Sequence, residues 1–234
     1  MTVYDSQKLL DAISNGEPVE GEDLRGLDLK NLDLGGANLR GSDMRNTNLS
    51  DTNLEEAHLE RVTLEGAILK RTNFTGAHLS YVSLHDVDLS SCRLKRLTAL
   101  DSNFLRVRIS GQDLSKSNLS GSVIIHSAFK DLDLSESTFE NMKILFSHFE
   151  SCNLDKCRLK ESNLGMSSLI KTSLNEAILK NVSLMATDIK DVQIRNAALD
   201  LLDLTLAQIH GLDVTGSKQR GIIMEKATVK NIKR

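Results

Sequence analysis

Large apolar residues return every five positions along almost the whole chain. The frame begins at Leu24 and continues without a shift to Val229, which gives 42 such positions, and Leu, Ile, Val, Met or Phe fills 40 of them. The exceptions are Ala99 and Gln219. A period of five matches neither the 3.6-residue repeat of a helix nor the two-residue repeat of a strand. The pattern therefore indicates a repeat architecture.

A second position in each repeat, two residues before the large apolar one, is almost always uncharged. Ala37, Thr47, Val62 and Cys92 are examples, and Glu22 is the one charged occupant. Two inward residues separated by one outward residue follow strand alternation, and the remaining two residues turn a corner. Each pentapeptide thus predicts a very short strand plus a corner. Repeated turns of one hand wind such a chain into a solenoid.

The repeat closely resembles that of the pentapeptide repeat family. The family consensus, A(D/N)LXX, is matched by Ala37-Asn38-Leu39, Ala57-His58-Leu59 and Ser162-Asn163-Leu164, and the resemblance extends from residue 22 to about residue 232. It implies an all-β fold, a right-handed four-sided parallel β-helix with about twenty residues per coil. On that geometry the frame predicts about 10–11 coils and a rod about 50 Å long, at about 4.8 Å per coil.

The N-terminal segment, residues 1–18, predicts a short capping helix on the first coil. Asp5 or Ser6 is the candidate N-cap, and Asn15-Gly16 followed by Pro18 is a stop signal. One apolar face is available to cover the open core, because a solenoid exposes its apolar cross-section at each end. That face consists of Leu9, Leu10 and Ile13.

We expect the pentapeptide repeat β-helix over residues 19–216, and an irregular last coil with a basic C-terminal tail over residues 217–234. Gln219 occupies a core position there and Gly221 follows it. Residues 215–234 carry a net charge of +5. The tail is either a solvated, frayed end or a contact with an acidic partner.

The sequence offers few of the features from which an active site is built. The unbroken frame leaves no long loop, and an interior filled by Leu leaves no pocket with convergent polar groups. His58 and His78, twenty residues apart, are expected to stack on neighbouring coils without a third ligand. The three cysteines fall in the small inward position and are expected to be buried and inert: Cys92, Cys152 and Cys157. We therefore predict no enzyme, no cofactor, no metal site and no small-molecule substrate.

Compartment and partner class follow from composition. The chain has no apolar run of about 18 residues and no basic, then apolar, leader, so we expect no membrane span and a cytoplasmic location. Secretion by a pathway that is independent of a signal peptide stays an open alternative. The formal net charge of −3 argues against direct binding of nucleic acid.

One face of the predicted rod carries a row of outward apolar residues when the chain is stacked in twenties. We call this row the stripe; it consists of Leu105, Ile125, Leu145, Phe146, Met166, Met185 and Leu206. The other three faces carry isolated apolar residues at most, which is ordinary for a protein surface. A contiguous apolar row predicts an interface. It serves a homodimer or a protein partner, or else the side chains fold back onto their own coil.

Two functions are compatible with these observations. The first is a non-enzymatic protein–protein interaction module of a bacterium, which the family resemblance extends to a secretion accessory, as in type VI secretion, or an effector. The second, also implied by the resemblance, is quinolone-resistance-type binding of DNA gyrase or another topoisomerase by mimicry of DNA. The mimic's acidic patch would be Asp23, Asp28, Asp33, Asp43, Asp51, Glu55, Glu56, Glu60 and Glu65. A mimic needs a continuous negative surface, whereas residues 66–130, with a net charge of +5, interrupt this one.

Overall fold

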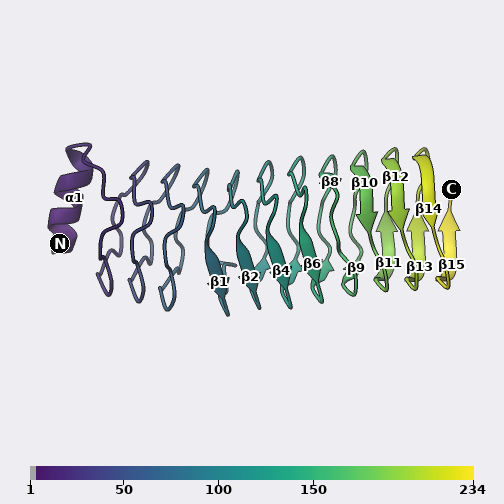
Figure 1. Cartoon of the computed structure of the whole chain (residues 1–234), viewed down its shortest axis with the longest axis horizontal. Helices are drawn as coiled ribbons and strands as arrows, with labels where there is room; N and C mark the ends of the chain where they lie inside the picture. Colours follow the sequence, from purple (N-terminus) through teal and green to yellow (C-terminus); the bar gives the residue numbers. More distant parts are fainter. Residues whose placement is uncertain (1–3) are drawn as a thin grey trace.

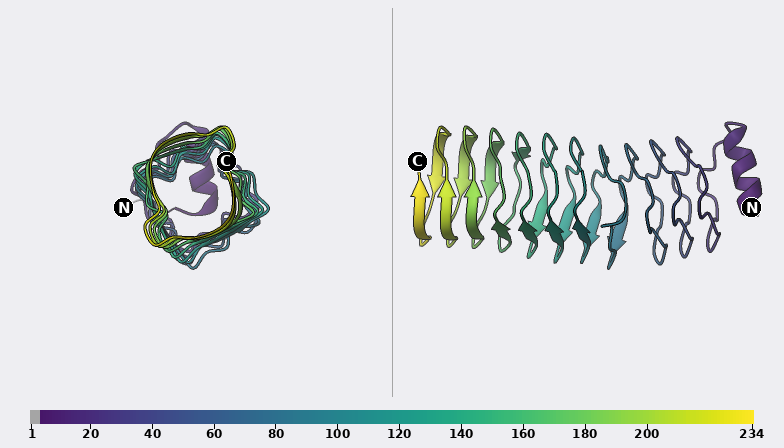
Figure 2. Two further views of the ribbon diagram at one scale, coloured as in Figure 1. Left: turned by 90° about the vertical axis from the view of Figure 1, so that its right-hand side faces the viewer. Right: turned by 180° about the vertical axis from the view of Figure 1, so that it is seen from behind.

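The coils stack along one axis into a rod that has a helix at its N-terminal end. The computed structural model describes residues 4–234, so residues 1–3 of the predicted capping segment lie outside the described residues. Helix α1 (Ser6–Ser14) lies at one end of the rod and strand β15 (Thr228–Lys233) at the other (Figure 1). Viewed down the axis, the coils superpose as one closed outline (Figure 2). The predicted all-β, parallel β-helix with a short N-terminal helix is confirmed.

Each coil pairs with the next in a constant register of twenty residues. The register holds from the bridge between Asp23 and Asp43 to the pairing of Asp213 with Lys233, and every pair is parallel. At twenty residues per coil, the span from Asp23 to Lys233 makes between ten and eleven coils. Residues twenty apart therefore form columns that run along the rod.

Regular strands begin in the middle of the rod, after coils that are joined by isolated bridges. One sheet contains β1 (Ser83–His85), β2 (Asn103–Leu105), β4 (Val123–Ile125) and β6 (Lys143–Leu145). A second contains β8 (Arg158–Lys160), β10 (Ile178–Ser183), β12 (Ala198–Asp203) and β14 (Lys218–Ile223). The third contains β3 (Arg108–Ser110), β5 (Ala128–Lys130), β7 (His148–Glu150), β9 (Ser168–Ile170), β11 (Asp188–Gln193), β13 (Gln208–Asp213) and β15.

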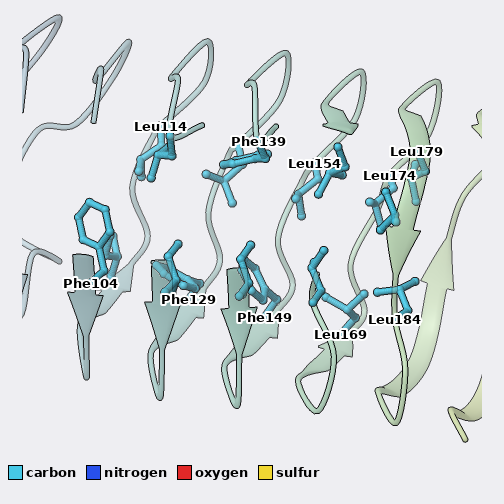
Figure 3. Close-up of a pocket in the computed structure, with 18 of the residues that line it drawn as sticks. Phe104, Leu114, Phe129, Phe139, Phe149, Leu154, Leu169, Leu174, Leu179 and Leu184 are labelled. Carbon is cyan, nitrogen blue, oxygen red and sulfur yellow. The ribbon is translucent and has the colours of Figure 1, made fainter. Parts of the chain in front are cut away.

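The large apolar residue of each repeat fills the interior. Leu24, Leu94 and Leu199 are at most 1% exposed. In Figure 3, labelled side chains from successive coils, such as Phe129 and Phe149, gather inside the rod. The rings of these two phenylalanines lie on adjacent coils with centroids 4.8 Å apart. The core is thus a set of apolar columns that repeat at the spacing of the strands.

The small inward position often holds a hydroxyl or thiol, and the backbone satisfies it. The side chain donates to a carbonyl 23 residues earlier, as Thr52 Oγ1 does to Leu29 O at 2.7 Å and Ser122 Oγ to Ala99 O at 2.6 Å. A buried polar group is costly only when it lacks a partner. Serine and threonine are therefore compatible with the interior of this rod.

The second corner residue of the repeat adopts a left-handed backbone conformation in most coils. Gly41 has φ 68°, Asn46 has φ 58° and Phe146 has φ 52°. Glycine adopts this conformation without the clash that a Cβ atom causes, which explains the recurrent corner glycines. A bulky residue at this position is tolerated at a conformational cost.

Helix α1 covers the N-terminal end of the core. Asp5 is its N-cap, since the carboxylate accepts a hydrogen bond from Lys8 N at 2.8 Å. Leu9 and Ala12 are buried, and the side chains of Tyr4, Leu10 and Ile13 pack partly buried against the same core. The helix thus shields apolar surface that the first coil would otherwise expose.

The last coil differs from the expectation of an irregular end. Strands β14 and β15 keep the twenty-residue register with β12 and β13, and Gly216, Gly221 and Lys226 keep the left-handed corners. The reason is that Gln219 sits on the open end and is exposed, so its polar side chain is not forced into the core. The pairing between β12 and β14 uses backbone N–H and C=O groups, which glutamine provides as well as leucine does.

We expect Phe149→Ala to lower the free energy of unfolding by about 3–5 kcal/mol, because it opens a cavity in a packed core. Urea denaturation followed by circular dichroism measures the loss. Phe146→Ala is the matched control: it removes the same side chain from the outer surface three residues away, and a change of less than about 1 kcal/mol is expected. Equal losses in the two variants would contradict the inward and outward assignment.

Candidate protein interface

The stripe lies along one face of the rod, as the register predicts. Leu105, Ile125 and Leu145 are the last residues of β2, β4 and β6, which pair side by side. Phe146 takes the corner directly after β6. Met166 occupies the same corner column one coil later, and Leu206 three coils later, with Ala186 between them. Met185 continues the column of Leu145. The column geometry thus brings all seven predicted residues onto neighbouring positions.

Four residues of the stripe are the most exposed: Phe146 (48%), Met166 (51%) and Leu206 (49%) in the corner column, and Met185 (43%) in the column of Leu145. Leu105, Ile125 and Leu145 are less exposed. Side chains that remain about half exposed have not folded back onto their own coil. The alternative in which the stripe side chains fold back onto their own coil therefore loses support for these four residues.

The sequence analysis missed two exposed apolar residues that widen the stripe near the C-terminus. Ile223 is 44% exposed on the strand column of the stripe face, and Leu201, 52% exposed, occupies the corner before that face. Both line one shallow hollow, which Asn181 and Asp203 also line. The same twenty-residue period predicts both positions as outward ones, since Ile223 shares a column with Asp203 and Leu201 shares one with Asn181.

Three stripe residues adopt the left-handed backbone conformation, which glycine and asparagine favour. Phe146, Met166 and Leu206 have φ of 52°, 56° and 61°. A left-handed L-residue costs roughly 1–2 kcal/mol relative to the right-handed region, and glycine or asparagine adopts it far more readily. These side chains therefore destabilise the corner and also expose apolar surface. Neither property helps the chain to fold.

The backbone behind the stripe is held by a buried row of serine side chains. Ser127 N donates to Ser147 Oγ at 3.2 Å, and Ser147 N donates to Ser167 Oγ at the same distance. Ser147 Oγ in turn donates to Leu145 O at 3.0 Å, directly beside the corner. Such bonds fix where the stripe side chains leave the rod, which preorganises a contact surface.

Charged residues border the stripe at both ends of its corner column. At the N-terminal end, Arg106 forms an ion pair with Asp86 at 2.5 Å. At the C-terminal end, Lys226 occupies the same column, after Leu206. His126 lies between, with its ring stacked on Phe146 at 5.2 Å between centroids. The corner column thus has the Arg106–Asp86 ion pair at one end of the apolar row and an ammonium group at the other.

The predicted acidic patch is largely neutralised and is not one surface. Five of its nine residues form ion pairs with arginine: Asp23 with Arg25, Asp43 with Arg45, Asp51 with Arg71, Glu56 with Arg96, and Glu60 with Arg40. Hydrogen bonding to Arg25 lowers the pKa of Asp23 to about 2, so the carboxylate stays ionised beside its partner. Because residues twenty apart share a column, the nine lie in eight different columns around the coil.

The titratable interior is inert. Burial raises the pKa of Cys92 and Cys157 to about 12 and that of Cys152 to about 11. Thiolate is the nucleophilic form of cysteine, so these three residues have very little of it at neutral pH. The predicted buried, unreactive thiols agree with this environment.

The interior of the rod holds a small apolar cavity (Figure 3). Its volume is about 40 Å³ and core side chains from Leu89 to Ile194 line it. Ligand sites usually enclose about 300–1,000 Å³ and carry a few polar groups. The cavity is therefore a packing defect between columns of Leu and Phe.

The only helix among residues 4–234 is too short to cross a membrane. Among residues 4–234, one group of side chains brings metal-ligating atoms close together. It consists of His58, Glu60 and His78, and it lies outside the stripe.

The fold is a parallel β-helix that carries an exposed apolar stripe on one lateral face. A family model, pentapeptide repeats in eight copies, matches residues 23–61, 57–96, 102–141 and 152–191. The chain belongs to the pentapeptide repeat family. Proteins of this family are generally non-catalytic structural modules.

Two solved structures resemble the chain at low sequence identity. HetL, a pentapeptide repeat protein involved in heterocyst differentiation regulation from the cyanobacterium Nostoc sp. strain PCC 7120, is 20% identical, with 98% of this chain and 97% of that chain covered and a TM-score of 0.46. Full-length QnrB1, a plasmid-mediated fluoroquinolone resistance protein, is 13% identical, with 89% and 91% covered and a TM-score of 0.34. Among curated proteins, none matches the chain.

Proposed function

We propose that the protein is a non-enzymatic interaction module that binds another protein surface through the stripe, and that its partner is a second copy of the chain. The observation that carries the proposal is the exposure of Phe146, Met166, Met185 and Leu206 in adjacent columns of one face. A role in secretion, suggested by the family resemblance, stays a prediction.

The size of the stripe suits the centre of an interface. From the coil of Leu105 to the coil of Leu206 there are five coil spacings, or about 24 Å at about 4.8 Å each. A standard interface buries about 800 Å² on each partner, more than so narrow a row supplies. The polar columns on either side would then form the rim that surrounds an apolar centre.

The charges at the two ends of the stripe favour a second copy in antiparallel orientation. A two-fold axis between the coils of Phe146 and Met166 would place Asp86 of one copy opposite Lys226 of the other, and the reverse. The same axis would place His85 opposite Glu225. In this register Arg106, which is paired with Asp86, faces Leu206 of the other copy. Moving the axis by half a coil toward either end removes the pairing of Asp86 with Lys226, since Asp86 then faces Leu206, or Arg106 faces Lys226.

We expect the double variant Leu145→Asp with Phe146→Asp to be monomeric under conditions where the wild type is a dimer, because two carboxylates would lose their hydration at the centre of the contact. Analytical ultracentrifugation over a range of concentrations measures the mass. Ile68→Asp is the matched control, since Ile68 is 53% exposed but stands outside the stripe. A wild type that stays monomeric at about 100 µM, where even a weak dimer with a Kd of about 10 µM would form, would refute the second copy as partner.

The orientation has its own test. In a chain carrying Asp86→Cys and Lys226→Cys, mild oxidation is expected to give a covalent dimer, because the axis brings the two positions together while the native thiols are buried. Asp86→Cys with Lys116→Cys is the control, since Lys116 is also a left-handed corner residue but belongs to another column. A dimer that survives by mass yet forms no disulfide would contradict the orientation and leave the stripe as interface.

Mimicry of DNA has less support. Arginine neutralises five of the nine acidic residues, and the unpaired ones, such as Asp33 and Glu55, are spread around the rod. A phosphate backbone presents one negative charge per about 1.7 Å along the duplex axis, a density these residues do not approach.

We therefore expect no inhibition of DNA gyrase supercoiling at micromolar protein, measured on relaxed plasmid. Inhibition by the wild type that is lost in Asp33→Asn with Glu55→Gln would instead support mimicry of DNA.

A further inference from the structure

The outer surface of the N-terminal coils carries a group of metal-ligating side chains outside the stripe. His58 and His78 pair across adjacent coils, and their rings stack with centroids 5.0 Å apart and an interplanar angle of 21°. Glu60 follows His58 by two residues, so strand alternation returns its side chain to the same outer side. The ligand atoms of all three residues lie within 4.8 Å of one another.

The environment of Glu60 favours a cation. Its Oε2 atom is shielded from solvent and accepts no hydrogen bond from residues 4–234, although Arg40 Nε lies 3.0 Å away. The carboxylate is thus partly buried and, beside its ion pair with Arg40, keeps one oxygen atom without a hydrogen bond.

A cationic side chain already occupies the space between these ligands. One terminal nitrogen of Arg40 lies 2.7 Å from His58 Nδ1 and 3.2 Å from Glu60 Oε1. A guanidinium can only donate, so His58 Nδ1 acts there as an acceptor, with the lone pair that a metal ion would use. Arg40 has a second carboxylate in reach, because its other terminal nitrogen lies 3.9 Å from Glu20. It can therefore leave the ligands and keep an ionic partner.

We propose that His58, Glu60 and His78 form a surface site for a divalent transition-metal ion, with Arg40 as its competitor. Two imidazole nitrogens and one carboxylate are a donor set that zinc uses, and with three protein ligands the fourth position is open to water. Imidazole suits zinc, copper and nickel, whereas magnesium and calcium prefer sites made of oxygen atoms. The ion would join two neighbouring coils through side chains that are otherwise only stacked.

The experiment titrates metal-free full-length protein with zinc chloride by isothermal titration calorimetry. We expect one ion per chain in the wild type. His78→Ala should weaken binding about tenfold or more, since one of three ligands is lost. Arg40→Gln should strengthen it several-fold, since the competing charge is removed. A merely adventitious histidine would not respond to Arg40 in this way.

Two controls keep the proposal falsifiable. His85→Ala removes an exposed histidine outside the group and should leave the affinity unchanged. Thermal unfolding of each variant without metal checks that the coils remain folded. Cobalt in place of zinc should give visible absorption bands that His78→Ala abolishes. Absence of zinc binding in both the wild type and Arg40→Gln, or equal affinity in the wild type and His78→Ala, would overturn the proposal.

Discussion

The hydrogen-bond ladder between coils is the constraint on which the rest of the structure depends. Lys143 N donates to Ser122 O in the preceding coil, and Ile144 N donates to Asn163 O in the following one, so a repeat inside the rod is held from both sides. Because this ladder belongs to the backbone, side chains do not alter it, and each outward residue lies about 4.8 Å from the residue twenty positions away. The stripe, the paired histidines and cross-coil ion pairs such as Asp51 with Arg71 all result from that one spacing.

The stripe is where the surface departs from the rules that stabilise the rod. Elsewhere, glycine, asparagine or a charged residue commonly occupies the left-handed corner, and its side chain, if it has one, is solvated. At Phe146, Met166 and Leu206 the corner is both strained and apolar. Sites where a protein breaks local rules without a gain in stability are those where function is expected. This coincidence of strain and exposure connects the conformation of three residues to the proposed binding surface.

Sequence alone predicts the repeat frame, the inward positions, the buried cysteines and the columns that build the stripe, because all of them follow from one fixed period. It does not predict features that depend on long flexible side chains. The five-residue period places Glu60 near His58 and His78, but only the positions of the side chains reveal that its carboxylate is a third ligand group close to both histidines. In the same way, the number of acidic residues in the sequence does not show that arginines form ion pairs with five of the nine residues of the predicted acidic patch. The irregular last coil was a wrong prediction, because a polar residue disturbs a core only where the core is closed, and Gln219 faces an open end.

The repeat of five and the coil of twenty have different symmetry, and this has a consequence for how such a surface can change. Five added residues complete one more side of the square, so all later coils rotate by a quarter turn while every inward residue stays inward. Such an insertion between Phe146 and Met166 would leave the core intact and carry the second half of the stripe onto the adjacent face. The rod can therefore gain or lose an entire binding surface through an insertion or deletion that leaves the packing of its interior unchanged.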